Sequence, residues 1–279
     1  MKIAILGLGL IGGSLGKSLK VFNNKVHNNK YRILGIGRKK DALNTAIKTG
    51  AVDEASLFLT DCFDADIIVI AMPVDLTVET YKKLISIVKK GAIITDVGSV
   101  KYSIEKEIED INKKGNFASF VGAHPMSGKE TNGLANSTAD LFNKANVVIT
   151  GSVKKSLKNE NIVAQMWQDA GANIIKMSAK KHDELVALTS HLPHLMAFAL
   201  HKIYKDKKSK DKDIEKILAG SFYSAIRVAS SSADMWAPIF ANNSANIKNN
   251  LNNFIKELNS LGKTLNNKIK VKKQILKTQ

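Results

Sequence analysis

The sequence predicts an α/β protein in which a doubly wound sheet is followed by an all-α domain. Up to residue 178, short apolar runs alternate with amphipathic stretches of helical length, a pattern typical of a parallel sheet covered by helices on both faces. A glycine-rich turn follows the first apolar run. After residue 178 the helical spacing continues and strand alternation stops. We therefore expect two domains, residues 1–178 and residues 179–279.

The expected strands of the first domain are apolar runs bounded by glycine, proline or polar residues. They are the segments 2–6, 31–36, 65–72, 92–98, 118–123, 146–150 and 173–178. The amphipathic segments between them predict helices over about 10–22, 41–50, 76–91, 103–115 and 156–170.

The second domain consists of segments with helical spacing: 182–205, 213–230 and 245–265. Their apolar faces are too extensive for these helices to cover alone. We therefore expect a homodimer that forms through this domain.

The chain carries a net charge of +17, much of it from lysines in segments 202–216 and 263–279. No zinc-finger spacing, aromatic platform or arginine cluster accompanies them, so we expect solvated lysines rather than a surface for nucleic acid. Cys62 is the only cysteine, which excludes an internal disulfide and is typical of a cytoplasmic protein. No apolar run is long enough to span a membrane, and the first residues lack the features of a secretory signal.

The motif GLGLIGG, directly after the first expected strand, has the spacing G-x-G-x-x-G. Gly7 permits a tight turn, Gly9 lets a pyrophosphate approach the backbone, and Gly12 lets the next helix pack against the sheet. The amides of Leu10 and Ile11, where the helix begins, would then face the phosphates. This strand–turn–helix context predicts a Rossmann-type domain that binds a dinucleotide. A glycine turn without a ligand is the alternative.

The identity of the dinucleotide depends on the end of the second strand, where an acidic residue would hold the ribose 2′-hydroxyl of NAD. Gly37 takes that position and Arg38 follows it, an arrangement that suits a 2′-phosphate. We expect NAD or NADP, with NADP favoured. Alternatively, Arg38 stacks on the adenine or lies in solvent.

Further candidates follow the later strands, because ligands of open α/β sheets lie over the carboxyl ends of the strands. Pro73 follows the third strand, Ser99 the fourth and His124 the fifth, at the start of GAHPMSGKETNG (122–133). We expect His124 to act as a general base whose ring is oriented by the Ser99 hydroxyl. A structural histidine bonded to a backbone carbonyl is the alternative.

The second domain contributes its own candidates. His191 and His194 lie three residues apart in SHLPH, so we expect them on one helix face, with Pro193 kinking the helix there. Arg227 is the only arginine in an apolar and serine-rich stretch, which suits the binding of a carboxylate. Trp236 is expected either to form the wall of a ring-binding pocket or to fill the core.

Each of these candidates has an alternative interpretation. His191 and His194 could hold a metal, but no cysteine or carboxylate cluster accompanies them, so we expect no metal; they could also be plain surface histidines. Arg227 could form a surface salt bridge instead. We assign no role to the remaining histidines, His27, His182 and His201.

The segments GLGLIGGSLG, AMPV, DVGSVK, GAHPMSGKETNG and SHLPH, together with the spacing from Arg227 to Trp236, occur in this order in prephenate and arogenate dehydrogenases. The sequence resembles that family over nearly its whole length. The resemblance implies a Rossmann-type domain joined to a helical dimerisation domain. It also implies oxidative decarboxylation of prephenate, or alternatively of arogenate, with hydride transfer to NAD(P) in tyrosine biosynthesis. Another two-domain dehydrogenase, of the 3-hydroxyacid type, is a further alternative, but such families lack the segment SHLPH.

The resemblance also implies roles for individual residues. His124 would accept the proton of the substrate hydroxyl with support from Ser99, and Arg227 would bind the ring carboxylate. The residues implied at the side-chain end of the substrate are Ser190, His191, His194 and Trp236. Glu130 resembles a family position that controls entry to the site. The sequence decides neither between prephenate and arogenate nor between NAD and NADP.

Overall fold

The computed structural model describes residues 1–27, 29–115, 118–128, 131–153 and 156–278. Its contacts divide the chain into two compact units, Met1–Asp183 with Ser231–Asn242, and Glu184–Ser230 with Asn243–Gln279. The first continuous stretch of the chain within the first unit runs to residue 183. The chain also returns to the first unit for one short segment, which the sequence pattern did not predict.

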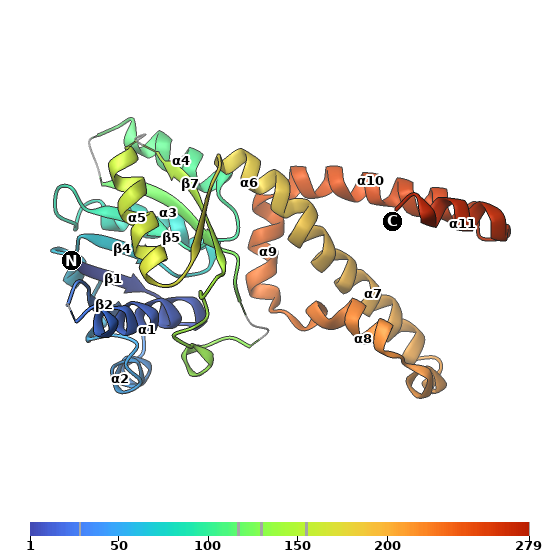
Figure 1. Ribbon diagram of the computed structural model, residues 1–279, viewed down its shortest axis with the longest axis horizontal. Helices are drawn as coiled ribbons and strands as arrows, with labels where there is room; N and C mark the ends of the chain where they lie inside the picture. Colours follow the sequence, from blue (N-terminus) through green and yellow to red (C-terminus); the bar gives the residue numbers. More distant parts are fainter. Residues whose placement is uncertain (28, 116–117, 129–130, 154–155, 279) are drawn as a thin grey trace. The chain divides into compact units, whose positions relative to one another are not determined.

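The first unit is built on one sheet with the strand order β3-β2-β1-β4-β5-β6-β7-β8 (Figure 1). The strands are β1 (Lys2–Leu6), β2 (Arg32–Ile36), β3 (Glu54–Ser56), β4 (Ile67–Ile70), β5 (Ile93–Asp96), β6 (Ser119–Pro125), β7 (Asn146–Ser152) and β8 (Asn173–Lys176). The helices of this unit are α1 (Leu10–Lys25), α2 (Lys40–Lys48), α3 (Thr77–Leu84), α4 (Tyr102–Asn112), α5 (Leu157–Asp169) and α9 (Ala233–Asn242).

Alternate residues of the strands face opposite layers of helices. Ile67 of β4 belongs to the same buried cluster as Leu15 of α1 and Trp167 of α5. Tyr81 of α3 instead packs edge-on against Phe120 of β6, and α3 also contacts α4. Because the strands are apolar on both faces and each face is covered by helices, the prediction of a doubly wound α/β fold is confirmed.

The direction of β7 corrects the expectation of a fully parallel sheet. β7 pairs antiparallel with β6, and β8 pairs parallel with β7. Adjacent parallel strands need a crossover connection, usually a helix. The described part of the segment between β6 and β7 contains only the short 3-10 turn Leu134–Asn136, so the chain returns antiparallel. The sequence also failed to predict β3, because three residues are too few to give a periodic signal.

The second unit is helical, as predicted, with no strand among its described residues. Helix α6 (Ala179–Val186) continues into α7 (Leu192–Lys208) through a π-helical turn, Ala187–His191. Pro193 has no amide hydrogen for the bond to the carbonyl four residues earlier, which favours a widened turn just before it. The expected kink at Pro193 thus takes the form of this π turn.

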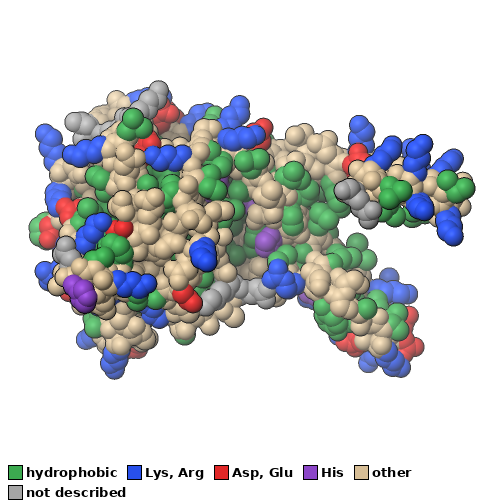
Figure 2. Space-filling model, in the orientation of Figure 1, with side chains coloured by type: hydrophobic (Ala, Val, Ile, Leu, Met, Phe, Trp, Pro, Cys, Tyr) green, Lys and Arg blue, Asp and Glu red, His purple; other side chains and the backbone are tan. Residues whose placement is uncertain are grey.

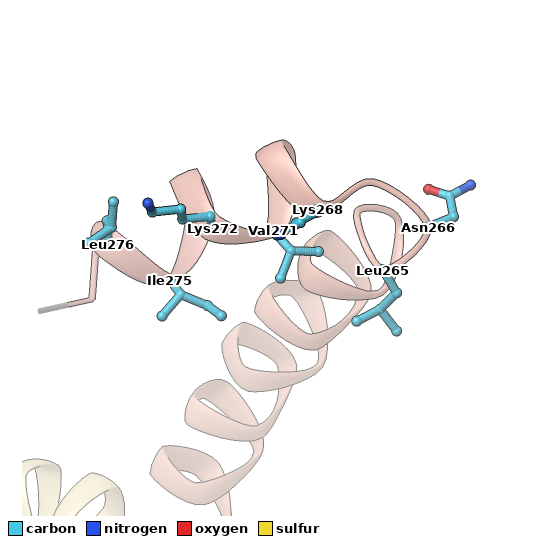
Figure 3. A pocket seen from close by; sticks show the side chains of 7 residues that line it. All are labelled: Leu265, Asn266, Lys268, Val271, Lys272, Ile275 and Leu276. Carbon is cyan, nitrogen blue, oxygen red and sulfur yellow. The ribbon is translucent and has the colours of Figure 1, made fainter.

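The remaining helices of the second unit are α8 (Gly220–Ile226), α10 (Ser244–Gly262) and α11 (Lys268–Leu276). Helix α11 contains much of the lysine-rich tail, and lysines gather over it (Figure 2). Val271 and Ile275 point to the side of α11 on which α10 lies (Figure 3), where they line a shallow cavity of about 650 Å³. No helix in the described part of the chain combines the length and the apolar character that a membrane crossing requires.

Candidate active site

The glycine-rich turn lies between β1 and α1, at the point where the order of the strands reverses. β1 pairs with β2 on one side and with β4 on the other, so the crevice above their carboxyl ends is a topological switch point. Gly7 has φ +96°, and a Cβ there would overlap the carbonyl oxygen of Ala71, directly after β4. Only glycine tolerates both the positive φ and the close approach of the Ala71 carbonyl oxygen.

The other two glycines have different surroundings. A Cβ on Gly12 would overlap the carbonyl oxygen of Gly7, so this glycine allows α1 to pack tightly against the turn. A Cβ on Gly9 would meet nothing within 4 Å. Gly9 caps α1, and the first turn of that helix, which starts at Leu10, contains no acidic residue. Open space beside helix amides with no competing carboxylate fits a pyrophosphate group.

The ends of β2 and β4 hold the other residues assigned to the cofactor. Gly37 follows β2, and its amide donates to the Ser56 carbonyl; Arg38 is exposed. Pro73 caps the 3-10 turn Val74–Leu76 directly after β4. Both segments lie at the carboxyl ends of strands that flank the glycine turn, where the sequence predicted them.

His124 is the penultimate residue of β6, and its side chain is buried. Its ring packs edge-on against His182 with the centroids 5.0 Å apart, and Nδ1 of His124 lies 2.8 Å from Nε2 of His182. His182 in turn places Nδ1 2.7 Å from Oδ1 of Asp183. An imidazole, a second imidazole and a carboxylate therefore form a continuous hydrogen-bonded series.

The carboxylate at the end of this series is held by backbone amides. Asp183 accepts hydrogen bonds from the N–H groups of Lys101 and Tyr102, each 2.9 Å long, where helix α4 begins. Lys101 is itself completely buried and forms an ion pair with Asp96 at the end of β5. The same Asp96 accepts from the amide of Ala123, the residue before His124. Hydrogen bonds thus connect the end of β5 and the start of α4 both to Asp183 and to the residue before His124.

The His124 ring has a hydrogen-bond partner that the sequence did not predict. Ser99 lies in the turn after β5 and is half-buried, whereas Nδ1 of His124 contacts His182. The sequence had assigned no role to His182.

A signal for His182 was nevertheless present in the sequence. The buried positions from Ala179 to Ala187 are Ala179, His182, Asp183, Val186 and Ala187. These positions follow the i, i+3, i+4, i+7, i+8 spacing of a core-facing helix stripe. Polar residues at two positions of such a stripe require buried hydrogen-bond partners.

A second buried carboxyl group lies behind β6. Thr150 of β7 donates its hydroxyl to Glu105 of α4, and a Cβ on Gly122 would overlap Glu105 Oε1. Burial raises the pKa of Glu105 to about 7, partly opposed by the Thr150 hydrogen bond and the Lys101 charge. Glu105 is therefore close to half-protonated at neutral pH.

The two histidines of the helical unit that were expected to share a face have different hydrogen-bond partners. His191 is buried, and the side-chain amide of Asn243 donates to its Nδ1 at 3.1 Å. His194 is half-buried, and its Nδ1 donates to the carbonyl of Ser190 at 2.9 Å. The interpretation as plain surface histidines is therefore wrong for His191.

Arg227 lies at the end of α8, exposed, where it lines a cavity of about 460 Å³ with His201 and Tyr223. Burial lowers the pKa of His194, and the Arg227 charge lowers it further, against the Ser190 hydrogen bond. Arg227 and His194 therefore lie close enough to interact electrostatically within the second unit.

Trp236 belongs to the first unit through α9. The side chain is buried and packs against Phe240 at a centroid distance of 5.2 Å. Helix α9 contacts the turn Val74–Leu76 after β4, and Asn242 at its end accepts a hydrogen bond from Ser103 of α4.

Glu130, assigned to entry control, lies outside the described residues. Within the described residues, no group of three or more His, Cys, Asp or Glu side chains has the arrangement of a metal site.

A glycine turn at the switch point of a doubly wound sheet, a buried imidazole beyond the carboxyl end of β5 and a separate helical unit define the class of two-domain, dinucleotide-dependent dehydrogenases. The family model described as prephenate dehydrogenase, nucleotide-binding domain, matches residues 22–176. The model described as prephenate dehydrogenase, dimerization domain, matches residues 178–274. The chain belongs to the prephenate dehydrogenase family, and the resemblance noted in the sequence is confirmed.

Individual relatives agree with this assignment. Prephenate dehydrogenase of Lactococcus lactis is 30% identical over 93% of this chain and 70% of its own length. Cyclohexadienyl dehydrogenase of Zymomonas mobilis is 33% identical over 93% of this chain and 86% of its own length. Prephenate dehydrogenase from A. aeolicus, in complex with hydroxyphenyl propionate and NAD+, matches with a TM-score of 0.89 and 30% identity over 100% and 96% of the two chains. Synechocystis arogenate dehydrogenase matches with a TM-score of 0.82 and 26% identity over 100% and 97%.

Proposed function

We propose that this protein catalyses the NAD(P)-dependent oxidative decarboxylation of prephenate to 4-hydroxyphenylpyruvate, a step of tyrosine biosynthesis. The observation that carries the proposal is the buried His124 imidazole at the carboxyl end of β6, in the same unit as the glycine turn. Family membership and the likeness to an A. aeolicus prephenate dehydrogenase that binds hydroxyphenyl propionate and NAD+ support the same activity.

The reaction requires one base. The substrate is a cyclohexadiene with a 4-hydroxyl group and a ring carboxylate. A nicotinamide held at the glycine turn would supply the acceptor for the hydride of the carbinol carbon. His124 takes the hydroxyl proton on Nε2, because its Nδ1 faces His182. The ring carboxylate leaves as carbon dioxide, and its bonding electrons complete the aromatic ring. A general base of this kind contributes about 10²–10⁴ in rate.

The turn after β5 supports the same site. Ser99 lies at the carboxyl end of the strand next to β6, where we propose that its hydroxyl contacts the substrate hydroxyl or the nicotinamide. Pro73, in the turn after β4, would contact the cofactor with Gly7, Gly9, Leu10, Ile11 and Gly12.

The substrate carboxylates need cationic or hydrogen-bonding partners, and we propose them in the C-terminal half. The planar guanidinium of Arg227 would bind the ring carboxylate through two parallel hydrogen bonds. The residues proposed for the side-chain end of the substrate are Ser190, His191, His194 and Trp236. Burial and the Arg227 charge lower the pKa of His194 and so favour its neutral form. Its Nδ1–H is bonded to the Ser190 carbonyl, so its Nε2 would accept a hydrogen bond at the side-chain end of the substrate. Glu130 remains a prediction from the resemblance.

We also propose a homodimer formed through the helical unit. Large apolar side chains of this unit are at least 49% exposed: Ile203, Ile217, Tyr223, Leu258 and Leu265. Exposed apolar surface of this extent is typical of a protein–protein interface, and the matched dimerization-domain model supports the same conclusion. Sedimentation at micromolar concentration should give twice the mass of the chain. A monomer under those conditions would contradict the proposal.

A cytoplasmic location is the last part of the proposal. The single cysteine, Cys62, is buried and free, which suits a reducing compartment.

Steady-state kinetics with prephenate, arogenate and a 3-hydroxyacid, each against NAD+ and NADP+, test the proposed activity. We expect turnover of prephenate. We also expect a lower KM for NADP+, because Gly37 provides no acid for a ribose 2′-hydroxyl and Arg38 can bind a 2′-phosphate. Arg38→Gln should then raise the KM for NADP+ more than that for NAD+. Turnover of arogenate alone would assign the activity named for the Synechocystis relative. Turnover of the 3-hydroxyacid alone would contradict the proposal.

A further inference from the structure

His182 and Asp183 are buried polar residues for which neither the sequence nor the proposed reaction provides a role. Both side chains are at most 3% exposed. Buried polar groups are retained where they are hydrogen-bonded, and these two connect directly to the proposed base. Their position on the core-facing stripe of α6 leaves them little freedom to move.

The hydrogen-bond partners determine which nitrogens carry protons. The Asp183 carboxylate can only accept, and it already accepts from two backbone amides, so Nδ1 of His182 is the donor to Oδ1. In a neutral imidazole the other nitrogen then carries the lone pair. Nε2 of His182 therefore accepts from Nδ1 of His124. The lone pair of the neutral His124 ring is in consequence on Nε2.

We propose that His182 and Asp183 are positioning residues that fix the tautomer and the ring orientation of His124. This inference rests on the proposed function, in which His124 is the base. When His124 takes a proton on Nε2, its ring becomes positively charged while Nδ1–H remains bonded to His182. The Asp183 carboxylate, one ring further away, stabilises that charge without accepting the proton.

The surroundings hold this series rigidly. Asp183 is fixed by the start of α4, and the start of α4 is fixed by the buried ion pair between Lys101 and Asp96. Asp96 also binds the amide of Ala123, next to His124. The contacts form a closed ring through β5, β6, α4 and α6. Within this ring Nδ1 of His124 is bonded to His182.

The tautomers provide a direct test that does not depend on activity. Two-bond ¹H–¹⁵N correlation spectra of the full-length protein, assigned with His124→Asn and His182→Gln, distinguish the two neutral forms of each ring. We expect both His124 and His182 as the Nδ1–H form, which is the less common tautomer of free imidazole. In His182→Phe the His124 ring should shift toward the Nε2–H form. A wild-type His124 in the Nε2–H form would overturn the proposal.

Kinetics provide the second test. His182→Phe keeps the ring volume but has no acceptor, whereas His182→Gln offers an amide oxygen in its place. We expect His182→Phe to lower kcat about 10–100-fold, the range observed when a partner that orients a functional histidine is lost, with KM changed less than about twofold. His182→Gln should retain more of kcat than His182→Phe. The same two substitutions at the exposed His27 are the matched controls and should leave kcat unchanged.

The two tests separate the failure of this inference from the failure of the proposed function. If the wild type turns over neither prephenate nor arogenate, the spectra still decide whether the series sets the His124 tautomer. If the wild type is active and His182→Phe, folded by circular dichroism, has normal kcat, the positioning role is wrong while the proposed function stands.

Discussion

Two pairs of histidines lie in different units of this protein, and they differ in how their partners are brought together. His191 and His194 are neighbours in the sequence, yet each is bonded to a different group, Asn243 and the Ser190 carbonyl. His124 and His182 are 58 residues apart and share a hydrogen bond. A direct hydrogen bond therefore joins two rings that lie far apart in the sequence.

The difference follows from the local geometry. His191 ends the π turn and His194 lies in the first turn of α7, so both belong to one short helical segment. At the sheet, β6 extends beyond the end of β5 and carries His124 into the layer occupied by α4 and α6. The hydrogen-bonded series of His124, His182 and Asp183 thus results from elements that converge at the carboxyl ends of the strands, not from nearness along the chain.

The largest expected effect concerns the first pair. His124→Asn should lower kcat by about 10²–10⁴, because the substrate hydroxyl loses its base, while dinucleotide affinity and folding remain normal. Turnover of prephenate and fluorescence titration with reduced cofactor measure the two quantities. His27→Asn is the matched control. Near-normal turnover in His124→Asn would remove the functional distinction between the two pairs.

The next effect concerns the carboxyl group behind β6. The pKa of Glu105 is raised from its ordinary 4.5 to about 7, so the folded state favours the protonated form. The resulting stabilisation is fully present below about pH 4.5 and is lost as the pH rises through 7. The difference between the two pKa values corresponds to a change of roughly 3 kcal/mol at most in the free energy of unfolding.

Urea unfolding at pH 5 and pH 8 measures this contribution. Glu105→Gln should be less sensitive to pH than the wild type and more stable than it at pH 8. Glu107→Gln changes an exposed glutamate of the same helix, paired with Lys82, and should behave as the wild type. Equal pH dependence in Glu105→Gln and the wild type would mean that Glu105 is ionised in the folded protein.

A smaller effect concerns the second pair. Arg227→Gln should lower kcat/KM for prephenate about 10–100-fold, the cost of a lost charge-assisted hydrogen bond of roughly 1.5–3 kcal/mol. It should also raise the pKa of His194, because the positive charge beside that ring is removed. Proton NMR titration measures the pKa. Arg32→Gln, at an exposed arginine paired with Glu54, is the control. An unchanged kcat/KM would count against carboxylate binding by Arg227.

The smallest effect concerns the glycine turn, which belongs to the same unit as the first pair. Gly9→Val should fold normally, because a Cβ there meets nothing within 4 Å. It should weaken dinucleotide binding by about tenfold, or roughly 1.4 kcal/mol, since the side chain fills the space for the pyrophosphate. Calorimetric titration with the reduced cofactor measures this. Gly220→Val, also at an open position, should bind normally.

Much of the first unit could be predicted because its signals are local. The apolar runs, the glycine spacing and the strand–turn–helix order each involve a few consecutive residues, and the family resemblance rested on similarly short segments. The antiparallel β7 and the return of α9 to the first unit depend on long-range packing. No local period encodes such packing.

The residues of the candidate site also fall into those with a local sequence signal and those brought together by long-range packing. His124 and Ser99 were predicted as site residues because they follow strands, where ligands of such sheets bind. His182 was missed because it lies within an amphipathic helix, where a polar residue is normally on the solvent side. Its place among Ala179, Val186 and Ala187 on the buried stripe was the available signal. Lys101 and Asp96 form a pair that only the turn after β5 brings together.

The most direct test of the proposed activity is the stoichiometry of its products. Purified protein is incubated with prephenate and oxidised cofactor, and carbon dioxide, reduced cofactor and 4-hydroxyphenylpyruvate are measured in the same reaction. We predict equal amounts of the three products, formed at a rate that His124→Asn reduces at least about 100-fold. Reduced cofactor without carbon dioxide, or equal rates in the two proteins, would contradict the account.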